Sequence, residues 1–556
     1  MFGLSADDTV TSRLRYWSVT SPETLAFVYV TPDGQRFAYT RKELFSMSRR
    51  AASWLHKRNV CKSDVLLCLV PTSPEQMLIA LGTELLGATV MCTNMQYRDG
   101  SDISPLMKNA DVTTLVVDET DQQAIAALQT FIPNLSAPSV ISEAVPSLKS
   151  VIFCNRFSQL SFLVAVVAEE EGDLADVSPD DVTTIFATSG SSGQPKLVTR
   201  THREVMTMGL NYYQCCLHTE SRPKMGVHYN SSSFGWMSGY PSIYFTSGKT
   251  KVVPYFKGAP PNDEAKFLMD LLKKESVDSA VLLPPTIKTL LARADLLQCD
   301  VTWRLPLIIT GANAVRTDVA PAIGPLTSEL RVVYGCTEVG FVSYKTYDDP
   351  GKVVNFNCGR HVDGMAVKIV DDNLREVPPN TKGEVMIKHN GFFTGYLNQP
   401  DLTADATPED GWFRPRDLAY INNEGDLFVE GRQSEVIAIS SWRFYPQLLE
   451  SHLMECPGVH DVAVVAIPDK DFENLPCVCV VQDPRPEAPR VVPDHLLRAC
   501  AEYFQDSFVQ LSKQAELSVP KVCLVFDKFP LNPNGKVQRR ALRALAVERL
   551  GLLTDK

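Results

Sequence analysis

The first half of the chain alternates between two periods of hydrophobic residues. Residues 42–57 carry apolar side chains at helical spacing, an apolar run follows at 65–70, and residues 74–86 return to the helical period before another apolar run at 87–92. Helical spacing predicts amphipathic helices, and the short runs predict buried strands. Strands that alternate with helices predict parallel sheets with crossover connections. Further short buried strands are expected at 252–253, 280–283, 307–309 and 331–333.

The pattern changes twice in the second half. From about 358 to 429, shorter alternating stretches separated by turn residues predict a smaller β-rich unit. An α/β pattern resumes after Gly431-Arg432. A chain of 556 residues exceeds what one hydrophobic core normally supports, so we expect two domains, residues 1–431 and 432–556. In the second domain we expect a helix at 446–454, a strand at 462–467 and a helix at 494–504.

Composition narrows the class of protein. The net charge of −11 argues against a general nucleic-acid-binding protein, because such proteins face phosphates with a surplus of Lys and Arg. The N-terminus lacks the features of a secretory signal. The densest apolar run, residues 160–168, is too short for a transmembrane helix, which needs about 20 residues. The 14 cysteines form no CxxC pairs with zinc spacing, so we expect reduced thiols in a cytoplasmic protein.

A Ser/Gly-rich stretch carries the first chemical signal. Residues 188–196 (TSGSSGQPK) follow a strand-like run at 183–187. Small residues let backbone N–H groups surround an anion, hydroxyls add donors, and a lysine supplies positive charge. The spacing matches neither a Walker A loop nor a dinucleotide-binding G-x-G-x-x-G. Such a stretch can also be a flexible connection, so the residues alone leave phosphate binding and a linker open.

The string T-S-G-S-S-G-x-P-K resembles the phosphate-loop signature of the adenylate-forming superfamily, which includes acyl- and aryl-CoA ligases, peptide-synthetase adenylation domains and beetle luciferases. Further signatures follow in the family's order: Tyr334-Gly335-Cys336-Thr337-Glu338, Gly411-Trp412-Phe413-Arg414 with Asp417, Gly431-Arg432, and Asn532-Pro533-Asn534-Gly535-Lys536-Val537. Five matches in the same order as in the family are very unlikely to arise by coincidence. Their spread indicates that the resemblance covers nearly the whole chain.

The resemblance implies an α/β fold with a large N-terminal domain of two α/β subdomains plus the β-rich unit. A smaller, mobile C-terminal α/β domain would turn about a hinge at Ser434. The implied activity is that of an acid–thiol ligase, which forms acyl-AMP from a carboxylic acid and ATP with Mg²⁺ and then a thioester with CoA. Fatty acid metabolism is the implied setting.

The resemblance also implies roles for single residues. Lys536 would contact the attacking carboxylate and the α-phosphate, where an ammonium neutralises the repulsion between two anions. Glu338 would hold the magnesium, and Asp417 and Arg432 would bind the ribose. The implied catalytic residues are Lys536, Lys196, Thr337 and Glu338. The implied ATP-binding residues are Thr188, Ser189, Gly190, Ser191, Ser192, Gly193, Lys196, Gly311, Ala312, Tyr334, Gly335, Thr337, Asp417 and Arg432.

The implied acid pocket includes Phe234, Trp236 and Gly239, where relatives place a pocket-lining helix. The F-G-W-x-x-G pattern resembles short- and medium-chain acyl-CoA synthetases. An aromatic residue at the start of a core helix explains Phe234 equally well. The stretch 310–314 (TGANA) would line the pocket floor beside the adenine. Neither stretch identifies the acid.

Several positions depart from the family pattern. Pro415-Arg416 replaces the usual Thr-Gly, and Leu197 replaces a Gly. Ser440-Ser441 stands where a glycine usually lets pantetheine approach the backbone. Two other family residues of this region, a Lys and a Glu, are Ala438 and Leu448. The adenylation residues are therefore intact, whereas the face expected to form the thioester is altered.

Three hypotheses remain open at this point. The first is a CoA ligase. The second is adenylation with another fate of the acyl group: transfer to a carrier-protein thiol, transfer to an amine, or slow release of acyl-AMP. The third is a non-catalytic relative that binds an acyl group or a nucleotide. The sequence leaves the acid and the oligomeric state undetermined.

Overall fold

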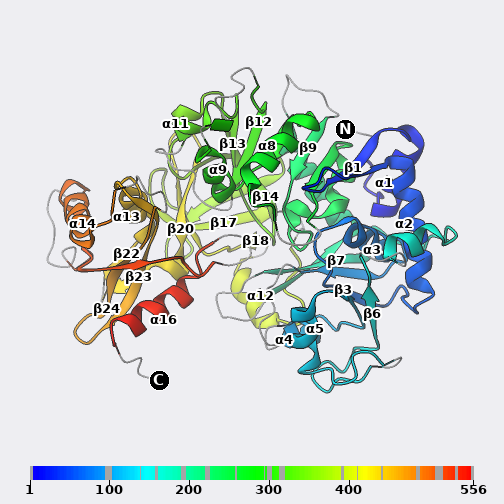
Figure 1. The fold of residues 1–556 in the computed structure, drawn as a ribbon. Helices are drawn as coiled ribbons and strands as arrows, with labels where there is room; N and C mark the ends of the chain where they lie inside the picture. The colour runs from blue at the N-terminus through cyan, green and yellow to red at the C-terminus, as the bar shows by residue number, and fades with distance from the viewer. Residues whose placement is uncertain are drawn as a thin grey trace.

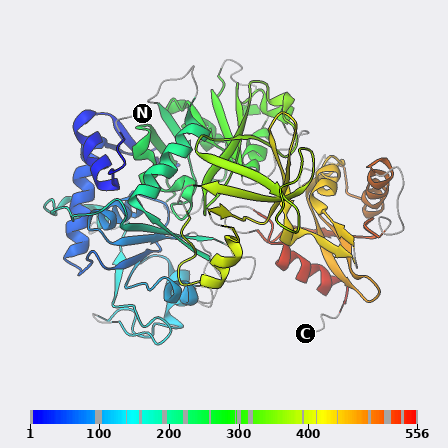
Figure 2. The ribbon, with the colours of Figure 1, turned by 180° about the vertical axis from the view of Figure 1, so that it is seen from behind.

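The computed structural model describes residues 4–93, 103–137, 140–156, 161–188, 196–218, 226–256, 260–293, 295–296, 303–311, 320–389, 393–409, 411–439, 442–483, 489–507, 517–531 and 536–552. This part of the chain forms two large sheets with helices around them and a C-terminal α/β unit (Figure 1). The opposite view shows the C-terminal unit, in orange and red, at one end of the molecule (Figure 2). The mixed α/β class expected from the sequence is confirmed.

The first sheet has six strands and carries the Ser/Gly-rich stretch at its edge. Its first five strands pair in parallel, and the last pair is antiparallel. The strand order is β6 (Ser150–Cys154), β5 (Thr114–Asp118), β3 (Val65–Cys68), β4 (Thr89–Cys92), β7 (Val182–Thr188) and β8 (Lys196–Thr201). The strands expected at 65–70, 87–92 and 183–187 are therefore present.

The N-terminal half contains seven described helices. They are α1 (Val10–Thr20), α2 (Arg41–His56), α3 (Pro74–Leu85), α4 (Ile103–Asn109), α5 (Gln122–Gln129), α6 (Phe162–Val167) and α7 (His202–Tyr212), which continues as the π-helix η1 (Tyr213–Leu217). Of these, α3, α4, α5 and α6 lie between successive strands of this sheet. Among the helices that the structure describes, none has the length and hydrophobicity needed to cross a membrane.

Local sequence explains where two of these helices begin. Thr40 caps α2, accepting a hydrogen bond from the Glu43 N–H while the Glu43 carboxylate accepts one from the Thr40 N–H. This reciprocal cap satisfies two otherwise unpaired donors. Ser73 caps α3, and Pro74 occupies its first turn, where a missing N–H costs nothing. Every residue of α3 is buried, because the helix packs within the core rather than on the surface.

The second sheet is larger and runs across the middle of the molecule. From β1 to β13 it is mainly parallel, and beyond β13 it is antiparallel. Its order is β16 (Met365–Val370), β17 (Gly383–His389), β19 (Asp417–Ile421), β20 (Leu427–Arg432), β15 (Asn357–His361), β14 (Gly340–Tyr347), β13 (Leu330–Cys336), β12 (Leu307–Gly311), β11 (Ser279–Val281), β9 (Val227–Asn230), β10 (Thr250–Pro254), β1 (Leu25–Val30) and β2 (Arg36–Thr40), with β18 (Trp412–Phe413) beside β17.

The β-rich unit expected from 358 to 429 is present, but its strands continue the large sheet. Pairing of β14 with β15 and of β15 with β20 joins the two parts. The described helices of this part of the chain are η2 (Met237–Gly239), η3 (Pro241–Thr246), α8 (Glu264–Lys274), α9 (Pro284–Leu291), α11 (Ala320–Ile323), η4 (Pro350–Lys352) and α12 (Pro400–Ala406).

The C-terminal unit begins after the last strand of the large sheet. A 3-10 turn, η5 (Gln433–Glu435), leads into the hairpin of β21 (Ile437–Ile439) and β22 (Trp442–Phe444). A three-stranded sheet of β23 (Val459–Asp469), β24 (Glu473–Gln482) and β25 (Val522–Phe526) follows. Its helices are α13 (Pro446–Leu453), α14 (Pro493–Ser507) and α16 (Arg539–Arg549). The expected α/β pattern after residue 432 is therefore present.

Candidate active site

The Ser/Gly-rich stretch joins two antiparallel strands. β7 ends at Thr188 and β8 begins at Lys196, and these residues are partners across the hairpin. Both residues are half-buried, so neither is enclosed in the core. The remaining residues assigned to phosphate binding lie outside the described residues: Ser189, Gly190, Ser191, Ser192 and Gly193. A stretch that lies between two strands differs from a Walker A motif, which lies between a strand and a helix, and this agrees with the spacing.

The second signature, at 334–338, covers the end of β13 and the start of the turn to β14. Gly335 is needed there, because an added Cβ would lie 2.4 Å from the Gly340 carbonyl oxygen. Thr337 is half-buried, and Glu338 is only 9 % exposed. The turn is therefore packed against the protein, and it presents a hydroxyl and a carboxylate at consecutive positions.

Arg200 ties this turn to the Ser/Gly-rich hairpin. It lies on β8, its side chain is fully buried, and its guanidinium donates to the carbonyl oxygens of Thr337 at 2.5 Å and Glu338 at 2.6 Å. Burial lowers the pKa of Arg200 to about 10, against the raising effect of Glu204 and Glu338. The side chain therefore stays charged at neutral pH. Sequence analysis did not identify Arg200, since its carbonyl partners are remote in the chain.

Tyr396 makes a second connection between the same two elements. Its hydroxyl donates to Oε1 of Glu338 at 2.8 Å, and its ring centroid lies 4.8 Å from Nζ of Lys196. Burial raises the pKa of the Tyr396 phenol, and the Glu338 carboxylate raises it further, so the group remains a donor. Sequence analysis also missed Tyr396. The only local signal is Gly395-Tyr396-Leu397-Asn398, a turn-like string whose partner strand cannot be read from the sequence.

Asp417 and Arg432 meet across the last two strands of the N-terminal part. They are paired residues of β19 and β20, and Nε of Arg432 lies 3.4 Å from Oδ1 of Asp417. The Tyr334 hydroxyl donates to Oδ2 of Asp417 at 2.6 Å. Burial raises the pKa of Asp417, against the lowering effects of Arg432, Tyr334 and Lys536. Three residues of the predicted ATP site are thus brought together.

Lys536 approaches this group from the C-terminal unit. Burial lowers the pKa of Lys536 and so does the charge of Arg432, whereas Asp417 and Glu435 raise it. The charges of Arg432, Asp417 and Glu435 therefore act on the Lys536 ammonium. In Figure 1 the red C-terminal segment runs back toward β20 in the same way. The neighbouring residues of this signature, Asn532 to Gly535, lie outside the described residues.

Gly311, at the end of β12, lies beside the neighbouring strand. A Cβ at this position would lie 2.5 Å from the Val333 carbonyl oxygen, so only glycine fits without a shift. Val333 directly precedes Tyr334, which places Gly311 next to the second signature. Ala312, also predicted to bind ATP, lies outside the described residues.

The predicted acid-pocket helix is absent. Residues 234–236 form a turn, and only Met237–Gly239 is helical, as a single 3-10 turn. Phe234 is fully buried and Trp236 half-buried, so the two aromatic rings face different environments. The backbone at Gly239 passes so close to Ser232 that a Cβ would lie 2.3 Å from that carbonyl oxygen. This tight reversal, with Pro241 two residues later, is incompatible with a continuous α-helix.

One departure from the family pattern has a visible structural consequence. Arg416 stands in the glycine position with a φ of 66°, a left-handed conformation that favours glycine. Its side chain approaches Glu384 and hydrogen-bonds to Asp405. Ser434, the predicted hinge, is exposed within η5. Ser440-Ser441 lies outside the described residues.

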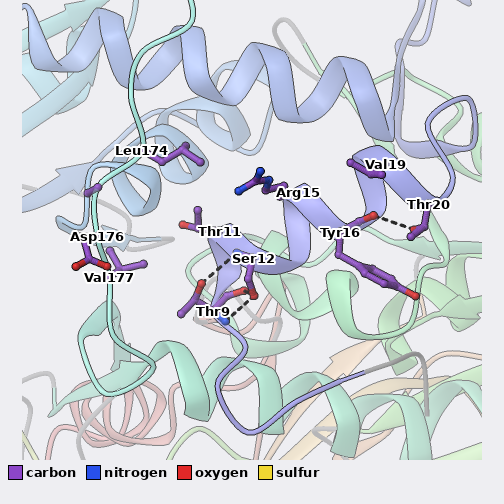
Figure 3. Close-up of a pocket in the computed structure, with 11 residues that line it drawn as sticks. Thr9, Thr11, Ser12, Arg15, Tyr16, Val19, Thr20, Leu174, Asp176 and Val177 are labelled. Atoms are coloured by element: carbon purple, nitrogen blue, oxygen red, sulfur yellow. Dashed lines mark hydrogen bonds between the residues drawn. The ribbon is translucent and has the colours of Figure 1, made fainter.

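Two surface cavities differ in their relation to this group. One of about 510 Å³ lies between α1 and residues 174–177, lined by Thr9, Ser12, Arg15 and Tyr16, and contains none of the signature residues (Figure 3). The other, of about 530 Å³, is lined by Thr199, Tyr396 and Pro400 among others. The second cavity therefore adjoins the Lys196–Tyr396–Glu338 group.

Comparison with known proteins places the chain in a family. Residues 14–397 match the family model of the AMP-binding enzyme, and residues 448–536 match that of the AMP-binding enzyme C-terminal domain. The 4-coumarate--CoA ligase 3 of Oryza sativa subsp. japonica is 27% identical over 525 residues, which cover 92% of this chain and 88% of the relative.

Solved structures support the same fold. ATP-bound MatB from Rhodopseudomonas palustris matches with a TM-score of 0.78 and 21% identity, over 98% of this chain and 99% of that chain. The anthranilate CoA ligase AuaEII in complex with anthranoyl-AMP matches with a TM-score of 0.80 and 18% identity, over 99% of each chain. Because the first family model alone covers more than half of the chain, the protein belongs to the AMP-binding enzyme family.

Proposed function

We propose that the protein activates a carboxylic acid with ATP, releases pyrophosphate, and transfers the acyl group from acyl-AMP to the thiol of CoA. The observation that carries this proposal is the buried Asp417 carboxylate, which Arg432 and Tyr334 contact and on which the charge of Lys536 also acts. These residues come from opposite sides of η5. Family membership and the CoA ligase names of relatives such as that of Oryza sativa support the same reaction.

ATP would lie between the two sheets and the C-terminal unit. Asp417 and Arg432 offer an acceptor and a donor for the ribose hydroxyls. Thr188 and Lys196 stand at the two ends of the Ser/Gly-rich hairpin, where the leaving pyrophosphate would be held. Thr337 would donate to a phosphate oxygen, and Lys536 would bridge the α-phosphate and the attacking carboxylate.

Glu338 would contribute to a Mg²⁺ ion that accompanies ATP. Within the described ranges, no cluster of three or more His, Cys, Asp or Glu side chains could hold a metal ion. Mg²⁺ usually keeps several waters and binds one or two carboxylates together with substrate phosphates. A single carboxylate at the Thr337–Glu338 turn therefore fits the ion in the way nucleotide-dependent enzymes use it.

The chemistry proceeds in two steps. A carboxylate oxygen bonds to the α-phosphorus while the bond from that phosphorus to the pyrophosphate oxygen breaks. Charge accumulates around phosphorus, where fixed cations contribute most. The CoA sulfur, having lost its proton to solvent, then bonds to the acyl carbon, and AMP leaves. Rotation at Ser434 would remove Lys536 and admit the thiol between the steps.

Pyrophosphate exchange tests the first step. Labelled pyrophosphate should return to ATP only when a suitable acid is present, and the acids should include short, medium, long-chain and aromatic compounds. Exchange with none of them would contradict adenylation and favour a binding relative. AMP formation measured with and without CoA then tests the acceptor.

A non-CoA acceptor remains the second candidate because of Ser440-Ser441, which replaces a glycine at the pantetheine approach. Exchange without any acceleration by CoA would favour a carrier-protein thiol or an amine. We place the reaction in the cytoplasm, since the cysteines that the structure describes are all free, as expected in a reducing compartment.

A further inference from the structure

Tyr396 contacts the side chains of two residues of the proposed ATP site, and it comes from a segment that contains neither of them. Its hydroxyl bonds to the Glu338 carboxylate, and its ring lies under the Lys196 ammonium. Glu338 belongs to the turn after β13 and Lys196 to β8. A single tyrosine therefore connects the carboxylate proposed for Mg²⁺ with the cation proposed for pyrophosphate.

The surrounding backbone fixes the position of this tyrosine. Tyr396 forms an isolated antiparallel bridge with Val198 of β8, and the Leu397 N–H donates to the Leu197 carbonyl oxygen at 2.9 Å. The Tyr396 N–H donates to the Thr403 hydroxyl at 2.9 Å. Its side chain is 5 % exposed. The tyrosine is thus attached to the same strand that starts at Lys196, so its ring and hydroxyl are held in one direction.

The two contacts differ in chemistry. A phenol that donates to one carboxylate oxygen fixes the carboxylate plane and leaves the second oxygen for another partner, and hydrogen bonds to charged groups contribute about 1.5–3 kcal/mol. An ammonium over an aromatic ring gains about 0.5–1 kcal/mol at an exposed site and more when desolvated. The hydroxyl therefore acts on Glu338, and the ring acts on Lys196.

We propose that Tyr396 is a positioning residue, which orients the Glu338 carboxylate toward the nucleotide-bound Mg²⁺ with its hydroxyl and holds the Lys196 ammonium toward pyrophosphate with its ring. This inference rests on the proposed function. It adds a residue that none of the sequence signatures contains. It also assigns separate roles to the hydroxyl and to the ring of Tyr396, which substitutions can distinguish.

Two variants separate the contacts. Tyr396→Phe removes the hydroxyl and keeps the ring, whereas Tyr396→Leu removes both. Tyr255→Phe is the matched control, because the Tyr255 hydroxyl also lies 3.3 Å from a buried carboxylate, that of Glu75, which we do not place in the site. ATP affinity is measured by calorimetry with and without Mg²⁺ and without any acid, and the KM for pyrophosphate is measured in the exchange reaction.

For Tyr396→Phe we expect the Mg²⁺-dependent gain in ATP affinity to fall about tenfold, with the affinity in the absence of Mg²⁺ unchanged. For Tyr396→Leu we expect the same loss together with a rise of about threefold or more in the KM for pyrophosphate. Tyr255→Phe should change neither quantity. The melting temperature of each variant is recorded to confirm folding.

The inference is overturned if Tyr396→Phe retains the full Mg²⁺ gain, or if the two Tyr396 variants are indistinguishable. A fall in kcat or melting temperature alone would mean that the tyrosine is only structural. Failure of the proposed function looks different, since wild-type protein would then bind ATP but exchange no pyrophosphate with any acid. The calorimetric comparison still decides the role of Tyr396 in that case.

Discussion

A lysine in a loop rich in Pro, Gly and Asn is normally solvated, so Lys536 is unusual in its surroundings. Its ammonium interacts with a buried carboxylate and a guanidinium that belong to the last strands of the large sheet. Burial lowers the pKa of Lys536 because it disfavours the charged ammonium. Nearby anions are therefore needed to compensate for the lost solvent. The triphosphate and the substrate carboxylate would supply such anions.

Lys536→Ala should therefore lower the rate of acyl-AMP formation by about 10²–10³-fold, because the developing charge at phosphorus loses its cation. The rate is measured by pyrophosphate exchange at saturating acid and ATP. Thioester formation from supplied acyl-AMP should change little. Lys528→Ala, at an exposed lysine of the same unit, serves as control and should leave both rates unchanged. Equal losses in both steps would contradict the assigned role.

Arg416 illustrates a second effect at the scale of one residue, since a non-glycine residue occupies a left-handed position. That conformation costs an L-residue about 1–2 kcal/mol. Its ion pairs with Asp405 and Glu384 are partly exposed and compensate by at most about 1 kcal/mol.

Replacement of Arg416 by Gly and by Ala should consequently give different results. Both variants lose the ion pairs, but only Gly relieves the backbone strain, so Arg416→Gly should be more stable than Arg416→Ala by about 1 kcal/mol. Urea denaturation gives the two free energies of unfolding. Equal stability of the two variants would show that the left-handed conformation carries no cost here.

At the scale of secondary structure, periodicity predicted the elements well where local pattern decides them. The helix expected at 42–57 is Arg41–His56, and the strand expected at 462–467 lies within Val459–Asp469. The prediction of a helix in the acid-pocket stretch was wrong. Close backbone packing around Gly239, together with Pro241, gives 3-10 turns in place of an α-helix. Such packing depends on chain segments that meet only in the fold.

α3 shows what a fully buried helix requires. Its Glu84 accepts hydrogen bonds from the hydroxyls of Ser242, Tyr240 and Thr183, which come from β7 and from the η3 region. Burial nevertheless raises the pKa of Glu84 to about 7, with those three hydrogen bonds opposing the shift. The folded protein thus keeps a proton on Glu84 at a pH where the unfolded chain has released it.

Because the folded pKa lies above the unfolded value of about 4.3, the stabilisation by the proton is complete below that value and is lost as the pH rises through about 7. Glu84→Gln removes the titration and keeps the volume. The stability of wild type should fall relative to this variant between pH 5 and pH 8, by an amount on the order of 3 kcal/mol. Urea denaturation across this range measures it.

Glu376→Gln, at an exposed glutamate, is the control for this pH series. Its stability curve should run parallel to that of wild type. A Glu84→Gln curve that is also parallel would show that Glu84 is ionised in the fold throughout this range.

At the scale of the whole molecule, the candidate site residues come from three units. The sequence gives the order of these units along the chain but not which of their residues lie close together in the fold. The hairpin of β7 and β8 belongs to the six-stranded sheet, the turn with Glu338 and the Asp417–Arg432 pair belong to the large sheet, and Lys536 follows β25. The motifs identified most of these residues. Arg200 and Tyr396, which connect the units, were missed because each is defined by a partner far away in the chain.

The position of Lys536 also indicates which step the described arrangement serves. The charge of Lys536 acts on Asp417, a residue proposed to bind the ribose, so the arrangement suits attack of the carboxylate on ATP. We propose that Lys536 is no longer needed there when the thiol attacks. We therefore propose that the two steps use different positions of the C-terminal unit, and the connection between the units, η5, is short and exposed at Ser434.

Restricting that connection should separate the two steps. Proline fixes φ near −65°, so Ser434→Pro should hinder rotation while leaving the present arrangement usable. We expect pyrophosphate exchange to stay within a few-fold of wild type, and CoA-dependent AMP release to fall by about tenfold or more if rotation becomes limiting. Ser434→Ala, which retains backbone freedom, should keep both activities. Loss of exchange in Ser434→Pro, or an unchanged CoA response, would mean that the C-terminal unit reaches the thiol-accepting position without turning at this residue.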